Sequence, residues 1–329
     1  MKQRQLGQQG PTVSVLGYGA MSFTDFYGPA TDDGSMSVLD ACVELGITHI
    51  DTSNVYGMGR SETVIGEWLK RRGGEPPFAI ATKGGITRNT ERRFNNEAAH
   101  LTEMLDASLS RLGVEAIDLY YIHRRDPSVE IEAVTETLAG FVRAGKVKAI
   151  GYSEIAPSSL RRAHAVHPVA AVQSEYSLST RSPEMGLVQT CAGIGASLVA
   201  FSPVGRALLT DRPHQADAVA SMDFLKVNPR FQEPNLSANL AMNARFRALA
   251  ADMGVPAAAL AIAWLTHQGD HVLPIPGTRS IAHLRELAQG AAMDLSAEDL
   301  ARIDEVLPIG WAHGDRYSVG QWAGPERYC

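Results

Sequence analysis

Residues 117–152 read IDLYYIHRRDPSVEIEAVTETLAGFVRAGKVKAIGY, and this stretch decides the fold. It begins with a short apolar run at 117–123, continues with a helical pattern of apolar residues at 131–144, and ends with a second apolar run at 147–152. A strand, a helix and a strand in this order are typical of a βαβ unit, in which the two strands are parallel.

The same alternation extends over the whole chain. Further apolar runs of strand length lie at 13–19, 48–51, 78–83, 171–173, 197–202 and 272–275. Helical patterns between them lie at 33–45, 61–72, 97–112, 157–164, 183–193 and 257–267. Strands and helices repeating at roughly 30 residues per unit predict an α/β fold, a single (β/α)8 TIM barrel that comprises residues 1–329.

Several segments fall outside the eight units. Residues 2–11 carry turn signals at Gly7 and Gly10 and predict an N-terminal hairpin that closes one mouth of the barrel. Residues 206–239 are rich in Pro, Asp, Asn and Arg, and we expect an insertion there over a mouth of the barrel. Extra C-terminal helices at 281–290 and 297–306 and a tail at 309–329, rich in glycine and aromatic residues, follow the last strand.

A doubly wound dinucleotide-binding sheet is the alternative fold. Its fingerprint needs three glycines in the turn after the first strand. The turn at 17–22 reads Gly-Tyr-Gly-Ala-Met-Ser and lacks the third glycine. The barrel is therefore the better interpretation.

Composition excludes several classes of partner. Thirty Lys and Arg against 36 Asp and Glu give a net charge of −6, so the chain lacks the basic field that binds nucleic acid. Its longest strongly apolar stretch, residues 255–265, is shorter than the about 20 residues that span a bilayer. With no apolar leader at the N-terminus and only three separated cysteines, Cys42, Cys191 and Cys329, we expect a cytoplasmic protein.

Polar residues stand where consecutive strands end. Asp51, Lys83 and His123 follow three successive apolar runs, and Tyr56 lies five residues beyond Asp51. The carboxyl ends of barrel strands share one mouth, so these side chains are expected to meet in one cavity.

These four residue types suit the protonation of an oxyanion. An ammonium beside a tyrosine favours the phenolate and lowers the pKa of the hydroxyl, and a carboxylate keeps a buried lysine charged. A neutral histidine can hydrogen-bond the same oxygen and stabilise its developing charge. The set contains no nucleophile and no cluster of metal ligands, so a cofactor must supply the electrons.

The motifs around these residues resemble the aldo-keto reductase family, in particular its bacterial branch of pyridoxal and aldehyde reductases. The resemblance covers the whole chain. Its motifs are Gly-x-Gly-x-Met at 17–21, Asp-x-x-x-x-Tyr-Gly at 51–57, Thr-Lys at 82–83, Tyr-Tyr-Ile-His at 120–123, Gly-Tyr-Ser-Glu at 151–154, Val-Gln-Ser-Glu-Tyr-Ser at 172–177, Ala-Phe-Ser-Pro-Val-Gly-Arg at 200–206 and Pro-Ile-Pro-Gly-Thr-Arg at 274–279. It implies carbonyl reduction with Asp51, Tyr56, Lys83 and His123 as the catalytic tetrad and Tyr56 as the general acid.

The resemblance also implies an NADPH site, with NADH as a possible substitute. The nicotinamide would lie against Phe201, with Ser153 and Gln173 at its carboxamide. The other implied contacts are Ala20, Met21 and Asp51 near the nicotinamide, Ser202, Pro203, Val204, Gly205 and Arg206 along the pyrophosphate, and Gly277, Thr278 and Arg279 at the 2′-phosphate. Glu154, His283 and Leu287 complete the set, at positions where many members carry Asn, Arg or Lys, and Asn, respectively.

The expected partner is a small carbonyl substrate, while the oligomeric state is left open. The loops at 22–30, 85–95, 206–240 and 309–329 would shape its pocket. Arg124 either meets an anionic substrate or pairs with an acid, and the sequence favours neither. The alternative to an enzyme is a non-catalytic subunit that senses nicotinamide nucleotides, although retention of the whole tetrad argues against it.

Overall fold

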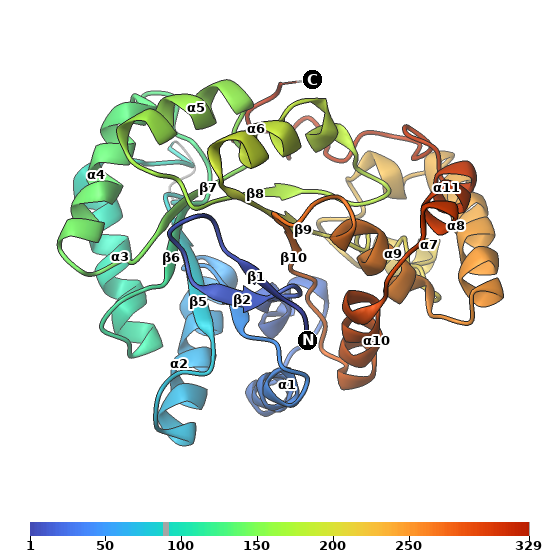
Figure 1. Cartoon of the computed structure of the whole chain (residues 1–329), viewed down its shortest axis with the longest axis horizontal. Helices are drawn as coiled ribbons and strands as arrows, with labels where there is room; N and C mark the ends of the chain where they lie inside the picture. The colour runs from blue at the N-terminus through green and yellow to red at the C-terminus, as the bar shows by residue number, and fades with distance from the viewer. Residues whose placement is uncertain (88–91, 329) are drawn as a thin grey trace.

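The computed structural model describes residues 1–87 and 92–328. Cys329 and residues 88–91, part of the loop expected to shape the pocket, lie outside the described residues. Parallel strands run side by side in the centre, with helices around them (Figure 1). The barrel strands are β3 (Tyr18–Gly19), β4 (His49–Asp51), β5 (Ala79–Gly84), β6 (Leu119–Ile122), β7 (Ile150–Ser153), β8 (Ala171–Glu175), β9 (Ser197–Phe201) and β10 (Val272–Pro274).

Each barrel strand pairs in parallel with the next along the chain, from β3 to β10. Backbone hydrogen bonds from Gly17 N to Pro274 O (2.9 Å) and from Gly19 N to Pro276 O (3.0 Å) then join β3 to the β10 side. The predicted (β/α)8 TIM barrel is therefore confirmed.

The helices cover the outside of the barrel, as apolar spacing requires. In α4, for example, Ile131, Val134, Leu138 and Phe141 are buried at intervals of three and four residues. The helices are α1 (Asp32–Glu44), α2 (Arg60–Arg72), α3 (Ala98–Leu112), α4 (Ile131–Arg143), α5 (Pro157–Val166), α6 (Leu187–Ile194), α7 (Ala216–Ala220), α8 (Asn235–Asp252), α9 (Ala257–Thr266), α10 (Ile281–Ala292) and α11 (Ala297–Val306). Short 3-10 turns are η1 (Ala20–Phe23), η2 (Asp25–Tyr27), η3 (Tyr56–Gly59), η4 (Ser182–Met185) and η5 (Pro229–Phe231).

The N-terminal hairpin closes the barrel at the amino ends of its strands. β1 (Gln3–Gln5) pairs antiparallel with β2 (Thr12–Ser14). Leu6 and Val13 are fully buried in the same cluster as inward residues of the barrel strands. Because this mouth is plugged, only the carboxyl ends of the strands are left for a site.

Three predicted boundaries were wrong for local reasons. The run at 13–19 is split, since its first part belongs to β2 in the hairpin and only Tyr18–Gly19 joins the barrel. The helix expected at 183–193 is broken at Gly186, whose φ of 136° separates η4 from α6. The hairpin extends beyond residue 11 because its second strand begins at Thr12.

The insertion over the mouth is more helical than the sequence suggested. It contains α7 and η5, and α8 begins within it. α8 lacks an apolar stripe because it buries Asn239 and Asn243, whose amides donate to backbone carbonyls at distances of 2.5–3.3 Å. Buried asparagines therefore replace the apolar residues by which a helix is recognised.

Within the described residues, no single helix is long and apolar enough to cross a membrane. Only α8 and α9 taken together reach that length and composition, and they are bent by 87°.

Candidate active site

A buried ion pair lies at the ends of β4 and β5. The Lys83 ammonium contacts Asp51 Oδ1 and donates to the Thr52 carbonyl at 2.7 Å, and both charged side chains are almost fully buried. Burial disfavours the ammonium, but the interactions with Asp51 and Tyr56 together outweigh burial and hold the pKa of Lys83 above its ordinary value. Gln173 on β8 donates to the other oxygen of Asp51 at 2.7 Å and fixes the carboxylate.

Tyr56 lies above this pair at the start of η3. Its hydroxyl is 3.5 Å from Lys83 Nζ, and the same Nζ lies 5.1 Å from the centre of the Tyr56 ring. The turn that carries Tyr56 is tight, because Gly57 and Met58 both have φ values near +58°. The loop after β4 thus brings the phenol back over the lysine that ends β5.

His123 completes the group from the end of β6. Its ring meets that of Tyr56 edge to face with centroids 5.8 Å apart, and its Nδ1 lies 3.0 Å from Ser53 Oγ. Burial, with the positive charges of Arg124 and Lys83, holds the pKa of His123 well below its usual range. The imidazole is therefore neutral.

The structure places the residues expected at the nicotinamide end around the same mouth. Ser153 ends β7 and Phe201 ends β9, and Phe201 is partly exposed. Ser153 Oγ accepts a hydrogen bond from Arg124 at 3.0 Å, and Glu154 has a positive φ of 57°. Ala20 and Met21 lie in η1, directly after β3.

The predicted phosphate end lies beyond β9 and β10. Gly277, Thr278 and Arg279 stand just before Ser280, whose hydroxyl caps α10 by accepting from His283 N. The exposed Arg279 guanidinium donates to the carbonyls of residues 27–29. A helix N-terminus beside an accessible guanidinium fits a phosphate group. His283 is exposed on α10, whereas Leu287 is buried.

Arg206 is placed differently from the other residues of its loop. The turn at 202–207 has positive φ values at Ser202, Gly205, Arg206 and Ala207. The Arg206 guanidinium points inward and binds both oxygens of Glu175 at 3.0 and 2.5 Å. In this conformation its side chain is paired with a buried carboxylate, whereas the exposed Arg279 guanidinium donates to neutral carbonyls and forms no ion pair with the described residues.

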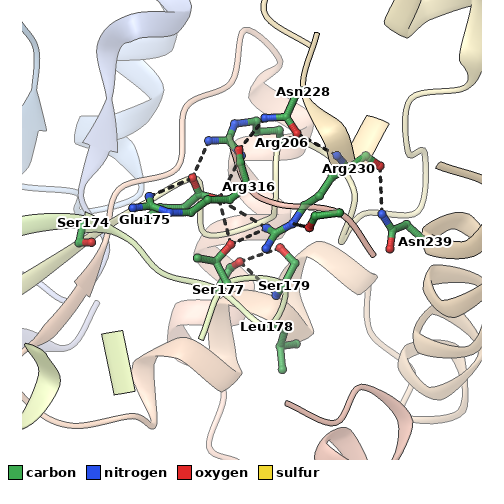
Figure 2. A network of polar contacts seen from close by, with 12 residues as sticks. Ser174, Glu175, Ser177, Leu178, Ser179, Arg206, Asn228, Arg230, Asn239 and Arg316 are labelled. Atoms are coloured by element: carbon green, nitrogen blue, oxygen red, sulfur yellow. Dashed lines mark hydrogen bonds and ion pairs between the residues drawn. The ribbon is translucent and has the colours of Figure 1, made fainter. Parts of the chain in front are cut away.

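Glu175 is the centre of a buried ionic cluster with Arg206, Arg230 and Arg316 (Figure 2). Glu154 belongs to the same cluster through its ion pair with Arg316. Arg230 and Arg316 lie 3.7 and 3.6 Å from the Glu175 carboxylate, and Arg316 binds Glu154 at 2.5 Å. Burial alone would raise the pKa of Glu175, but the three guanidiniums lower it to about 2. The cluster fastens the C-terminal tail, which carries Arg316, to the mouth of the barrel.

The family model for the aldo/keto reductases matches residues 15–308, nearly the whole chain. The chain belongs to the aldo/keto reductase family. The aldo-keto reductase yakc of Schizosaccharomyces pombe, whose name specifies NADP(+), is 36% identical over 323 residues, covering 96% of this chain and 94% of that protein. A probable aldo-keto reductase 1 of Glycine max is 40% identical over 319 residues, covering 96% and 92%.

Solved structures of the family share its fold. A glycerol dehydrogenase of Gluconobacter oxydans superposes with a TM-score of 0.81 at 26% identity, covering 93% of this chain and 94% of that one. The holo form of an aldo-keto reductase of Bacillus halodurans gives a TM-score of 0.78 at 25% identity, covering 93% and 96%. The chain is therefore an oxidoreductase of a family that uses nicotinamide cofactors.

Aromatic residues of this aldo-keto reductase gather near the mouth. Phe26 packs against Phe224 of the insertion, with ring centroids 5.4 Å apart, and Phe224 meets Tyr317 of the tail at 6.3 Å. Tyr317 in turn packs against Trp322 at 5.4 Å. The first loop, the insertion and the tail thus form a continuous aromatic contact, which sequence alone did not indicate.

Several residues of the site were not predicted from the sequence. Ser53 at His123 and the Thr52 carbonyl at Lys83 follow directly from their place after β4, and that position was the available signal. Glu175 ends β8 within a quoted motif, so the strand-end rule could have found it. Arg316 lies in an irregular tail, where no local sequence pattern predicts its partner.

Proposed function

We propose that this chain is an NADPH-dependent reductase that converts an aldehyde or ketone into the alcohol, and that residues 1–329 act as a single barrel domain. The observation that carries the proposal is the buried Lys83 ammonium, held by Asp51 and 3.5 Å from the Tyr56 hydroxyl. A phenol beside a permanent positive charge can release its proton to an oxyanion, because the charge stabilises the phenolate that remains.

The four residues divide the work of protonation. Tyr56 donates the proton, Lys83 stabilises the phenolate, and Asp51 keeps the lysine charged. His123 is neutral, and in the tautomer that accepts from Ser53 at Nδ1 the ring hydrogen is on Nε2, where it can be donated to the carbonyl oxygen. These two donors would orient the carbonyl and stabilise the charge that develops on its oxygen.

The cofactor supplies a hydride to the carbonyl carbon when it is bound. Phe201 would cover the nicotinamide, while Ser153, Gln173 and the backbone near Ala20 and Met21 would orient it. Gly277, Thr278 and Arg279 would hold the 2′-phosphate, with His283 and Leu287 behind them on α10. Arg279 is the reason to propose NADPH rather than NADH, because a guanidinium binds a phosphate in two parallel hydrogen bonds.

The test measures loss of NADPH absorbance with 4-nitrobenzaldehyde and with pyridoxal, beside the same assay with NADH. We expect turnover that prefers NADPH, and we expect Tyr56→Phe to lower kcat by about 10²- to 10⁴-fold, the usual contribution of a general acid. Tyr152→Phe is the matched control, since its hydroxyl bonds Thr135 on the outside of the barrel.

NADPH binding, followed by fluorescence, should stay within a few fold of wild type in Tyr56→Phe. Equal turnover by wild type and Tyr56→Phe would refute the general-acid role. Tight NADPH binding by wild type with no turnover of either aldehyde would instead favour a nucleotide-sensing subunit.

A further inference from the structure

Arg124 differs in its partners from the arginines that lie nearest to it at the mouth. Arg125 pairs with Glu326, Arg206 with Glu175, and Arg316 with Glu154. Among the described residues, no carboxylate lies within 4.0 Å of Arg124. Its Nη1 donates to two neutral acceptors, the His123 carbonyl at 2.7 Å and Ser153 Oγ at 3.0 Å.

The remaining donors of Arg124, Nη2 and Nε, make no hydrogen bond with the part of the chain that the structure describes. The side chain is only partly buried. Its two bonds hold the guanidinium between the ends of β6 and β7, beside His123. A fixed guanidinium with unused donors is prepared to bind a carboxylate or phosphate in two hydrogen bonds.

The charges under the mouth also favour an anion. The buried charged groups there are five cations, Lys83, Arg125, Arg206, Arg230 and Arg316, and four carboxylates, Asp51, Asp126, Glu154 and Glu175. Glu154 is the carboxylate nearest in sequence to Ser153, and its oxygens are taken by Arg316, Ser174 Oγ and Glu175 N. Arg124 therefore adds a further positive charge, and no carboxylate of the described residues forms an ion pair with it.

The C-terminal tail encloses this position. Gly324 packs against the stem of Arg124 so closely that a Cβ there would lie 3.1 Å from Arg124 Cγ. The tail thus covers the aliphatic part of the side chain at the rim of the barrel. Partial exclusion of water strengthens the attraction between a guanidinium and an anion.

The phosphates of the cofactor do not explain Arg124. The proposed phosphate site follows β10, and in the sheet order β8 and β9 separate β10 from β7 and β6. Arg124 instead bonds Ser153, at the proposed nicotinamide end, and adjoins His123. This is where the substrate, rather than the phosphates, would lie.

We propose that Arg124 is a specificity-determining residue that binds an anionic substituent of the carbonyl substrate, such as a carboxylate. This rests on the proposed function, because it extends the same site. It predicts that the enzyme prefers aldehydes carrying a negative charge over their neutral analogues.

The experiment compares the three isomers of formylbenzoate with their neutral methyl esters. For the best isomer, wild type should show a higher kcat/KM on the acid than on the ester. Arg124→Gln should lower this acid-to-ester ratio by about 10- to 100-fold, the range for one charged hydrogen-bonding contact. Arg124→Lys should keep an intermediate ratio, and added NaCl should lower the ratio in wild type more than in Arg124→Gln.

Arg245→Gln is the matched control, because Arg245 is exposed on α8 and forms no ion pair with the described residues. Its acid-to-ester ratio should equal that of wild type. If Arg124 were only structural, Arg124→Gln would lower kcat/KM for the acid and for the ester by the same factor. The acid-to-ester ratio would then be unchanged, and this result would overturn the proposal.

Failure of the proposed function would be seen separately, as no turnover of either acid or ester by wild type. In that case calorimetry of formylbenzoate binding, with NADP(+) present, tests Arg124 directly. Binding at least 10-fold weaker in Arg124→Gln than in wild type supports the anion site. Equal affinity, or no binding to wild type, overturns it.

Discussion

Two buried ionic groups lie at the same mouth of this aldo-keto reductase and are built in opposite ways. Lys83 and Asp51 form a pair from adjacent strands, with the lysine held by one carboxylate. Glu175 is shared by Arg206, Arg230 and Arg316, which come from the loop after β9, the insertion and the tail. The pair is a local product of the barrel, whereas the cluster joins segments distant in the sequence. The difference suggests that the pair serves chemistry and the cluster serves assembly of the mouth.

The largest effect is expected when the pair is broken by Lys83→Met. Turnover of 4-nitrobenzaldehyde should fall by at least about 10²- to 10⁴-fold, because Tyr56 loses the charge that stabilises its phenolate. The free energy of unfolding should fall by about 3–5 kcal/mol, since Asp51 is left buried without its counter-ion. Kinetics and urea unfolding measure the two losses.

A second substitution separates the loss of turnover from the loss of stability. Asp51→Asn in the Lys83→Met background removes the unpaired charge, so stability should return toward that of wild type while turnover stays low. If stability stayed as low as in Lys83→Met, the ion pair would not account for the loss.

Breaking the cluster should instead lower mainly the free energy of unfolding, and it should change how that free energy depends on pH. Glu175→Gln leaves three buried guanidiniums facing a neutral amide and should cost about 3–5 kcal/mol. The pKa of Glu175 is about 2 in the folded protein against an ordinary 4.5, so the unfolded chain binds the extra proton first as pH falls. Wild type should therefore keep this stabilisation above pH 4.5 and lose about 3 kcal/mol of it as pH falls toward 2.

The measurement is urea unfolding between pH 2.5 and 7. In Glu175→Gln the free energy of unfolding should fall less steeply toward low pH than in wild type, because the titrating group is gone. Glu305→Gln is the control, because Glu305 is exposed and forms no ion pair with the described residues. Its free energy of unfolding should depend on pH as in wild type. An equal acid loss in wild type and Glu175→Gln would show that other carboxylates carry the effect.

The contrast between the pair and the cluster also explains which parts of the site could be predicted from the sequence. Asp51, Lys83 and His123 could be predicted because each ends an apolar strand, and parallel strands bring their ends together. Thr52, Ser53 and Tyr56, which contact Lys83 or His123, follow Asp51 within five residues. The barrel itself was predictable for the same reason, since the local pattern of apolar residues indicates each βα unit.

The cluster could not be predicted, because its members are joined only by the path of the loops. Arg230 and Arg316 lie in segments without periodicity, and nothing in their own neighbourhood indicates a buried carboxylate. α8 was missed for a related reason, because its buried face includes Asn239 and Asn243. Polar residues inside a fold are specified by distant partners, and these are invisible to a local pattern.

The smallest effect is expected for an ion pair outside the mouth. Arg143 and Glu136 on α4 contact each other at 2.7 Å, close to the distances in the cluster, but their side chains are 65% and 60% exposed. Water screens both charges, so the coupling free energy from a double-mutant cycle of Glu136→Ala and Arg143→Ala should be below about 1 kcal/mol. It should also fall with added salt, as expected for exposed charges. A coupling as large as the loss in Glu175→Gln would mean that distance, rather than burial and shared partners, sets the strength of the ionic groups in this protein.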